Sequence, residues 1–127
     1  MIAATGIFED LSTLADVTRS RMLLLLDRHE LTVTELCAVL QLPQSTVSRH
    51  LKTLLDAGWV SSRREGTSRY YTLTLDTRGS SGRRLWTLLR EQVGNSAAAD
   101  QDARRLRTVL GARQSKSREF FESAAGQ

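Results

Sequence analysis

Hydroxyl and basic side chains gather on one side of a predicted helix that begins near Gln44. At about 100° of rotation per residue, that side carries Ser45, Arg49 and Lys52, with Thr46 and Thr53 beside them. Small hydroxyl side chains allow close approach to a base edge, and an arginine can bind guanine through paired hydrogen bonds. A helix that is polar in this way suits the major groove of DNA.

Two short helices separated by a proline must position these side chains. Pro43 lacks an amide hydrogen and has a fixed φ, so it can open a helix but cannot continue one. The sequence therefore predicts one helix over residues 33–40 and another from about residue 44 to Ala57, where Gly58 can form a left-handed cap. The apolar stripes of the two helices are Leu36, Val39 and Leu40, and Val47, Leu51, Leu54 and Leu55.

A basic β-hairpin is predicted next, over residues 59–64 and 69–75 with its turn at residues 65–68. Arg63, Arg64 and Arg69 crowd its tip against a single acidic residue, Glu65. An arginine-rich tip can reach phosphates or a minor groove. The alternative is a solvated, charged hairpin on any small domain. Because the helices, the proline turn and the basic hairpin occur in this order, DNA binding is the favoured interpretation.

Three segments resemble the ArsR/SmtB family of bacterial winged-helix repressors. Residues 14–21 (LADVTRSR) resemble the family's LADxTRxR segment, residues 47–60 (VSRHLKTLLDAGWV) its VSxHLKxLxxAGLV segment, and residues 64–73 its wing. The resemblance covers about residues 8–93. It implies a winged helix-turn-helix, mainly α with a small β-hairpin, in the order α-α-α-α-β-β-α-α. It also implies a cytoplasmic, nucleoid-associated homodimer that binds operator DNA and represses its own promoter until an effector releases it.

The side chains expected at the DNA lie on the second helix of the pair and on the wing. They are Gln44, Ser45, Thr46, Ser48, Arg49, Lys52, Arg63, Arg64, Thr67 and Arg69. Within this set, Ser45, Thr46, Ser48 and Arg49 are expected to read bases. Lys52 and the wing arginines are expected to hold phosphates.

The metal site of the resembled family is not expected in this chain. Metal-sensing members often carry an ELCVCDL segment whose two cysteines bind metal. Residues 30–36 here read ELTVTEL, so Thr32 and Thr34 replace both cysteines, and a hydroxyl is a poor ligand for soft metals. We interpret Cys37 as a buried, inert thiol, with a disulfide between subunits as the alternative. His29 is expected at a helix end, and His50 as a packing or phosphate-contacting residue.

Composition is consistent with a single domain without catalytic groups. The chain has 127 residues, 40% of them hydrophobic, and its net charge of +4 favours a polyanionic partner. The single cysteine fits a reducing cytoplasm, and no apolar stretch is long enough for a membrane span. Asp16, Asp27, Glu30 and Glu35 are interpreted as solvated charges, because no paired carboxylates, nucleophile–base set or phosphate loop stands out. We therefore expect no enzyme.

Four further helices are expected, over residues 8–15, 19–28, 83–93 and about 100–123, with a loop at residues 75–82. Thr18 can cap the helix at residues 19–28, which is the expected core helix. Arg19 and Arg21 at its start either contact phosphate or are solvated or helix-stabilising charges. The residues expected in a dimer interface are Leu11, Leu14, Trp86, Leu89, Val93, Leu106 and Leu110. The alternative for these is that they cover their own domain.

We divide the chain into a DNA-binding domain, residues 1–95, and a helical extension, residues 96–127, that joins the subunits or leads to a downstream domain. Residues 117–127 resemble the SxxFFxxxAGxWD junction in fusions of an ArsR-type domain with an S-adenosylmethionine-dependent methyltransferase. This resemblance makes S-adenosylmethionine or S-adenosylhomocysteine a candidate effector and a methyltransferase domain a candidate partner. A further alternative is a protein-interaction module that docks a partner through Phe120 and Phe121.

Overall fold

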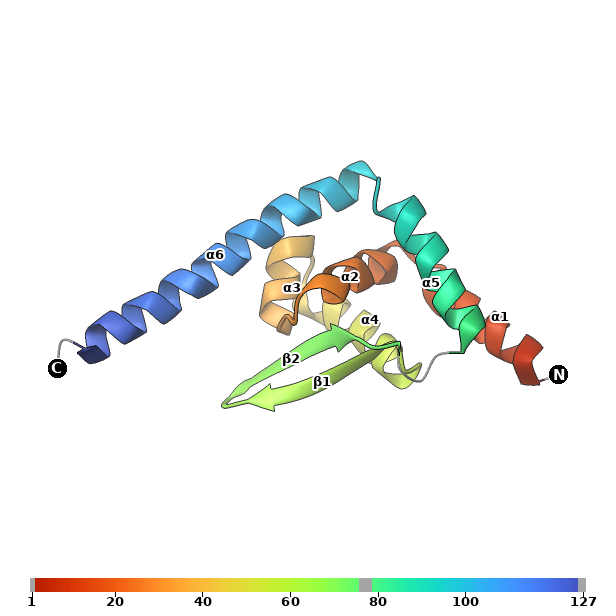
Figure 1. Cartoon of the computed structure of the whole chain (residues 1–127), viewed down its shortest axis with the longest axis horizontal. Coiled ribbons are helices and arrows are strands. Elements are labelled where there is room, and N and C mark those ends of the chain that lie inside the picture. Colours follow the sequence, from red (N-terminus) through yellow and green to blue (C-terminus); the bar gives the residue numbers. More distant parts are fainter. Residues whose placement is uncertain (1, 76–78, 126–127) are drawn as a thin grey trace.

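Figure 1 shows the computed structural model, which describes residues 2–75 and 79–125, with side chains for residues 6–75 and 79–118. The elements are α1 (Ile2–Leu14), α2 (Val17–Arg28), α3 (Val33–Leu40), α4 (Gln44–Asp56), β1 (Val60–Glu65), β2 (Ser68–Leu73), α5 (Ser80–Val93) and α6 (Ala97–Ala125). The predicted order of helices and hairpin is thus confirmed. The outer helices α1, α5 and α6 each extend beyond the predicted bounds.

The helix-turn-helix formed by α3 and α4 has the predicted bounds because its ends are determined locally. Thr32 and Glu35 form a capping box: the Thr32 hydroxyl accepts from the Glu35 amide at 3.2 Å, and the Glu35 carboxylate accepts from the Thr32 amide at 2.9 Å. Gln41 ends α3 in the left-handed region, at φ 57°. Pro43 then precedes α4, and Gly58 follows α4 with a φ of 78°.

Helix α2 lies at the centre of the core, as predicted. Met22, Leu23, Leu25 and Leu26 are all buried, and they pack with the buried apolar residues of α3, α4 and the start of β1. The cap of α2 differs from the prediction. Its first turn begins at Val17, and Asp16, rather than Thr18, accepts a hydrogen bond from the Arg19 amide at 2.9 Å.

The wing is a two-stranded antiparallel sheet that is anchored to the loop between α2 and α3. Gly66, at φ 62°, and Thr67 form a tight turn, so Glu65 pairs with Ser68 and Arg64 pairs with Arg69. Leu31 exchanges two backbone hydrogen bonds with Tyr71, at 3.1 and 2.9 Å. The base of the wing is therefore held against the core.

Helices α1 and α5 lie side by side at one end of the molecule (Figure 1). Trp86 of α5 is only 1% exposed and belongs to the core. Phe8 and Leu11 of α1 and Leu88 of α5 remain exposed, at 69%, 42% and 56%. This end of the protomer therefore presents apolar side chains to solvent.

Helix α6 crosses the opposite side of the molecule and packs against α2 and α3 (Figure 1). Leu106 enters the core, and Asp102 forms a buried ion pair with Arg21 of α2. We expected the sparse apolar stripe of α6 to need a second subunit or a downstream domain, but α6 packs on its own chain. The Arg21 guanidinium is therefore engaged within the protomer, which favours a structural role over the phosphate contact that the sequence left open. The side chains of Phe120 and Phe121 lie outside the described residues.

None of the described helices is long and apolar enough to cross a membrane.

Candidate nucleic-acid interface

Helix α4 separates the predicted base-reading side chains from the core. Val47, Leu51 and Leu54 on its inner side are at most 2% exposed. The outer side carries the exposed residues Gln44, Ser45, Ser48, Arg49 and Lys52, with Thr46 half-buried at its edge. The structure thus brings the six α4 residues of the predicted set together on one helix.

The basic side chains of α4 are available to a ligand. The Arg49 guanidinium has no hydrogen bond or ion pair with any residue that the structure describes. Lys52 pairs with Asp56 at 3.1 Å, but the two side chains are 77% and 66% exposed. An exposed ion pair of this kind contributes about 0–1 kcal/mol, so a phosphate can compete for Lys52.

Arg19 braces α4 against the end of α1. Its Nε donates to the Thr13 carbonyl at 2.7 Å, and its Nη2 donates to the Ser12 carbonyl at 3.2 Å. Its Nη1 lies 3.3 Å from Nδ1 of His50, which is half-buried on α4. Because Arg19 makes three such contacts, its side chain connects α4 to the end of α1, which favours a structural role for it. The same contact favours the packing alternative for His50.

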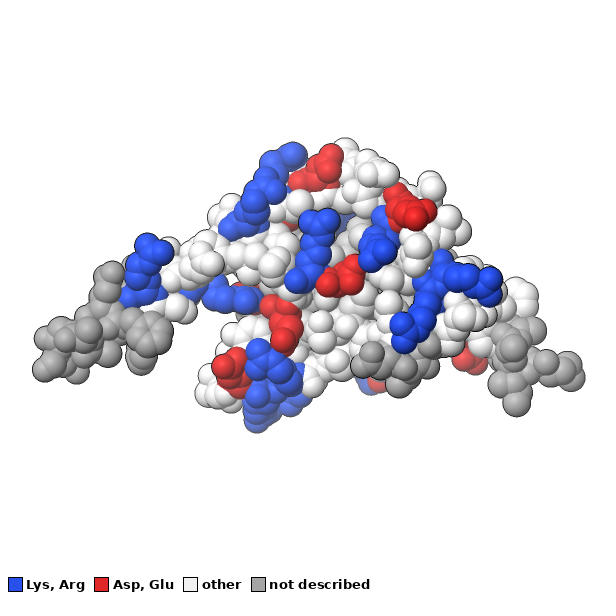
Figure 2. All heavy atoms as spheres, in the orientation of Figure 1, with Lys and Arg blue, Asp and Glu red and all other residues white. Residues whose placement is uncertain are grey.

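The wing divides the three predicted arginines between its two faces. Arg64 and Arg69 are directly paired across the strands and share one face, where Arg69 donates to the Ser62 hydroxyl at 3.0 Å. Thr67 is exposed in the turn beside them. Figure 2 shows basic side chains at this tip with acidic side chains directly beside them. Arg64 and Arg69, two of the three arginines predicted at the tip, therefore form the basic face of the wing.

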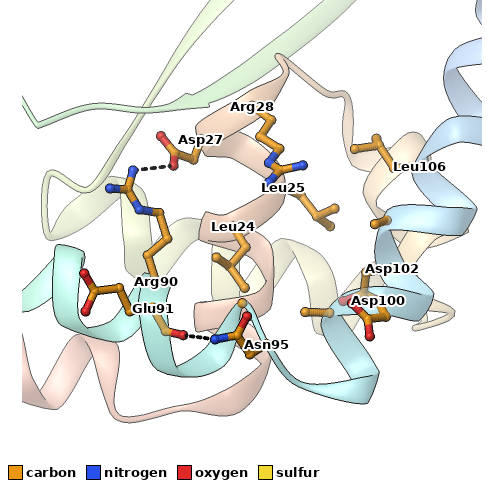
Figure 3. A pocket seen from close by; sticks show the side chains of 13 residues that line it. Leu24, Leu25, Asp27, Arg28, Arg90, Glu91, Asn95, Asp100, Asp102 and Leu106 are labelled. Atoms are coloured by element: carbon orange, nitrogen blue, oxygen red, sulfur yellow. Dashed lines mark hydrogen bonds and ion pairs between the residues drawn. The ribbon is translucent and has the colours of Figure 1, made fainter.

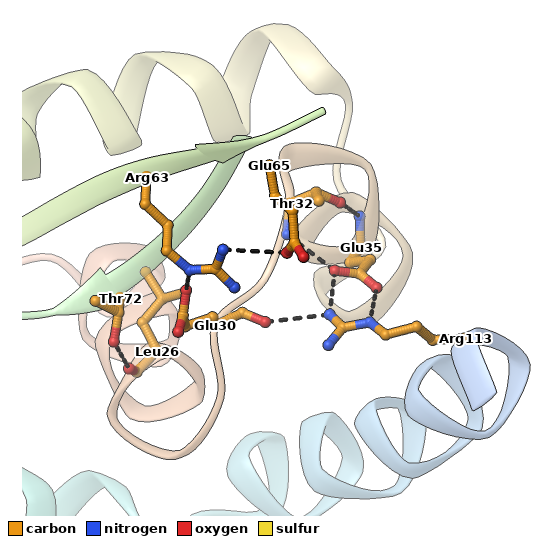
Figure 4. Close-up of polar contacts among 8 residues, drawn as sticks. All are labelled: Leu26, Glu30, Thr32, Glu35, Arg63, Glu65, Thr72 and Arg113. Atoms are coloured by element: carbon orange, nitrogen blue, oxygen red, sulfur yellow. Dashed lines mark hydrogen bonds and ion pairs between the residues drawn. The ribbon is translucent and has the colours of Figure 1, made fainter. Parts of the chain in front are cut away.

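Arg63 lies on the other face of the wing and is held there by acidic groups. It pairs with Glu30, which precedes α3, and with Glu65 at 3.1 Å (Figure 4). Its guanidinium also lies over the Tyr70 ring, 5.0 Å from the centroid. The structure therefore does not bring Arg63 together with Arg64 and Arg69. Side chains alternate between the two faces of a strand, so the adjacent positions of Arg63 and Arg64 already placed them on opposite faces. We had grouped the three arginines by charge alone.

Arg113 of α6 reaches the same region from the opposite side. Its Nε donates to Glu35 at 2.8 Å, its Nη2 donates to the other oxygen of Glu35, and the same Nη2 donates to the Glu30 carbonyl at 3.1 Å (Figure 4). Its guanidinium lies 5.5 Å from the Tyr70 centroid. Burial alone would raise the pKa of Glu35, but the hydrogen bonds from Arg113 and Thr32 outweigh it and lower that pKa below its ordinary value. The contact between Arg113 and Glu35 was not predicted from the sequence, because the two residues are 78 positions apart and no local pattern relates them.

The four acidic residues that we interpreted as solvated all have structural partners, so that interpretation is wrong. Asp16 caps α2, Asp27 pairs with Arg90 at 3.4 Å, Glu30 pairs with Arg63, and Glu35 pairs with Arg113. These contacts hold α2, α3, α5, α6 and the wing in place around the candidate interface.

Comparison with known proteins places these motifs in one family. The family model for the bacterial regulatory proteins of the arsR family matches residues 16–62. The arsenical resistance operon repressor of Staphylococcus aureus is 36% identical over 70 residues, which are 52% of this chain and 67% of that protein. The chain belongs to the ArsR family.

For two other relatives of this ArsR-family chain, the match covers a smaller fraction of the relative's length. The arsenic resistance transcriptional regulator ArsR1 of Pseudomonas putida is 51% identical over 61 residues, which are 47% of this chain and 48% of that protein. A transcriptional repressor SmtB homolog of Synechocystis is 40% identical over 65 residues, or 51% and 49% of the two chains. The chain thus spans about half the length of these two curated relatives.

Solved structures share the winged helix-turn-helix fold. Reduced HlyU from Vibrio cholerae superposes with a TM-score of 0.61 at 30% identity, covering 71% of this chain and 90% of that one. A homodimeric winged helix-turn-helix DNA-binding domain from Mycobacterium bovis, titled a possible ArsR-family transcriptional regulator, has a TM-score of 0.59 at 26% identity. It covers 76% of this chain and 85% of that domain. The predicted fold class is therefore confirmed.

The segment where the resembled metal sensors carry two cysteines has a structural role in this ArsR-family chain. Thr32 caps α3, and its neighbour Glu35 is engaged by Arg113. Cys37 is half-buried, and burial raises the pKa of its thiol, which lowers its reactivity. Within the described residues, no group of three or more His, Cys, Asp or Glu side chains could hold a metal ion.

The predicted dimer residues of this ArsR-family chain fall into two groups. Leu14, Trp86 and Leu106 are 6%, 1% and 6% exposed within one protomer, so they cover their own core and cannot serve as interface anchors. Leu11 is exposed, and three others are half-buried: Leu89, Val93 and Leu110. The prediction missed two exposed apolar side chains of α1 and α5, Phe8 and Leu88. Phe8 lies three residues before Leu11, so helical spacing places the two side chains on the same side of α1.

Proposed function

We propose that this chain is a homodimeric, sequence-specific DNA-binding transcriptional repressor. One observation carries the proposal: the outward side of α4 presents hydroxyl side chains and the unpaired Arg49, and the wing presents Arg64 and Arg69 together on one face. In this proposal, α4 enters a major groove and the basic face of the wing holds phosphates or a minor groove.

Base reading is assigned to Ser45, Thr46, Ser48 and Arg49. They lie along the first two turns of α4, where a recognition helix contacts base edges. Gln44, Lys52 and Thr67 are assigned to the phosphates beside them, because they are exposed at the borders of this surface. Arg63 is left out of the DNA contacts, since it is engaged with Glu30 and Glu65 on the other face.

The second subunit is proposed to cover the apolar end formed by α1 and α5. Phe8, Leu11 and Leu88 are exposed there, and contiguous exposed apolar groups mark interaction sites. The neighbour from Mycobacterium bovis is titled a homodimer. Two-fold pairing would place the recognition helices in half-sites about one helical turn, roughly 34 Å, apart.

We assign repression because three relatives are named as arsenic-resistance regulators or repressors, although HlyU of Vibrio cholerae is named a transcriptional activator. We propose that the effector does not bind at residues 30–36, the segment where metal-sensing relatives carry two cysteines. In this chain Thr32 of that segment caps α3. None of the relatives reported above is named for a methyltransferase, so that partner is not part of the proposal.

Fluorescence anisotropy with a duplex of the chain's own promoter tests this proposal. Tight binding that survives excess competitor DNA is expected, together with a dimer mass in sedimentation equilibrium. Only weak binding with a steep salt dependence and no preference for the promoter would overturn the repressor assignment. That result would favour the alternative that the chain is a protein-interaction module.

A further inference from the structure

A pocket of about 520 Å³ opens between α2, α5 and the first turns of α6 (Figure 3). Leu24, Leu25, Leu106 and Ala103 contribute apolar surface to it. Its volume lies within the range of roughly 300–1,000 Å³ that is typical of small-molecule sites. The DNA contacts proposed above use none of its lining residues.

Charged side chains of both signs line this pocket, and only some of them are paired. Asp27 and Arg90 close one side as an ion pair at 3.4 Å. Arg28 reaches over the pocket from α2, and Asp100 lies on the far side, on α6 (Figure 3). The side chains of Arg28 and Asp100 make no hydrogen bond or ion pair within the described part of the chain. The pocket therefore offers a ligand the Arg28 guanidinium, an apolar surface and the Asp100 carboxylate, with a second carboxylate, Glu91, on the α5 side.

We propose that this pocket binds a small zwitterion with an apolar body, of the size of a dipeptide, and that this molecule is the effector of the proposed repressor. Its carboxylate pairs with Arg28, its ammonium group with Asp100, and its apolar body covers Leu24 and Leu106. The role as effector rests on the proposed function, whereas the binding site does not.

Helix α6 connects this pocket to the DNA-binding elements. Leu106 lines the pocket, and Arg113 lies seven residues further along the same helix, about 10 Å away at 1.5 Å per residue. Arg113 joins α6 to Glu35 at the start of the helix-turn-helix and lies against Tyr70 of the wing. A ligand that contacts both α2 and α6 shifts the balance between docked and undocked α6, so its binding is coupled to the geometry of α3 and the wing.

The binding step is tested without DNA, by calorimetry with the full chain and three probes: leucyl-leucine, its N-acetyl derivative and its C-terminal amide. Leucyl-leucine is expected to bind, and each derivative at least about 10-fold more weakly, because each loses one charged partner. Arg28→Gln should weaken leucyl-leucine but leave the amide unchanged. Arg107→Gln, an exposed arginine of α6 outside the pocket, is the matched control.

The coupling step is tested by repeating the promoter titration with saturating leucyl-leucine. The expected change in DNA affinity is at least about 5-fold, and DNA must change the affinity for the dipeptide by the same factor. Arg113→Gln should abolish that change while the dipeptide still binds. If the dipeptide binds and DNA affinity stays constant, the effector role is overturned.

Three further outcomes separate this inference from the proposed function. No binding of leucyl-leucine, with promoter binding intact, overturns the pocket assignment and leaves the repressor standing. Dipeptide binding that depends on Arg28, without any promoter binding, supports the site and overturns the repressor. Equal binding of all three probes overturns the assignment of Arg28 and Asp100.

Discussion

Arg21 of α2 and Asp102 of α6 form a two-point ion pair, with Nε 2.8 Å from Oδ2 and Nη2 2.7 Å from Oδ1. The two side chains are 18% and 4% exposed, so the pair is almost entirely removed from water. It joins the core helix to the C-terminal helix beside the buried Leu106. Removal of either partner would leave the other charge buried without a counter-charge, which costs free energy of folding. The structure therefore depends on both side chains.

Asp102→Ala should lower the free energy of unfolding by about 3 kcal/mol, since it strands the Arg21 guanidinium away from water. Urea unfolding followed by circular dichroism measures this change. Asp100→Ala is the matched control, because it removes the same group from an exposed position two residues earlier, and it should cost at most about 1 kcal/mol, from the loss of a carboxylate in the first turn of α6. Equal effects of the two variants would contradict the role given to the buried pair.

Acidification should weaken the attachment of α6 to α3. The pKa of Glu35 lies below its ordinary value of 4.5, so the carboxylate contributes its full stabilisation above that pH and loses it as pH falls through the lowered pKa. The stability difference between the native chain and Glu35→Gln should therefore be constant from about pH 7 to 5 and shrink below about pH 4. A series of urea titrations measures it. A stability difference that stays constant on further acidification would contradict the pairing of Glu35 with Arg113.

Arg49→Ala should cost about 1–3 kcal/mol of operator binding and relax discrimination at one base position. The reason is that the Arg49 guanidinium is unpaired in the protein and can donate two hydrogen bonds to a guanine. Anisotropy with single-base operator variants measures both effects. Uniform weakening on every sequence would show that Arg49 holds a phosphate instead of a base.

The two faces of the wing should respond differently to loss of charge. Arg64→Gln should weaken binding to all DNA sequences and lower the slope of log affinity against log salt by about 1. Arg63→Gln removes the same group one residue away but on the opposite face, so its DNA affinity and salt slope should match the native chain. A loss of slope in Arg63→Gln as large as in Arg64→Gln would refute the division of the wing.

Leu88→Glu should shift the protein from dimer to monomer, because it places a charge within the exposed apolar end formed by α1 and α5. Sedimentation equilibrium measures the mass. Gln114→Glu, an exposed polar position on α6, is the control and should leave the dimer intact. If only the α6 variant dissociates the dimer, the subunits meet through the C-terminal helix.

The helix-turn-helix could be predicted to within one residue because its limits are local. Pro43 and Gly58 impose backbone conformations by their own covalent structure. The face of α4 followed from helical spacing alone, since Val47 and Leu51 must turn inward together. In such elements, residues within one or two helical turns determine both the ends and the buried face.

The errors concern charges whose partners are distant in the sequence. Arg21 is 81 residues from Asp102, and Glu35 is 78 residues from Arg113, so neither pairing leaves a local signature. Trp86 was misplaced for a related reason: an apolar helix face reads the same whether it meets its own core or a second subunit. Only the packing of α5 on α1 and α2 decides between them.

The attachment of α6 also has a consequence for the order of folding. Its ion pairs close loops of about 80 residues, whereas the contacts within the helix-turn-helix and the wing are short-range. Short-range contacts form first because less chain entropy is lost, so α6 docks onto a core that is already formed. By the same reasoning, α6 is the element that detaches first in the native state. Its amides should exchange with solvent deuterium faster than those of α2, through an opening that leaves the rest of the fold intact.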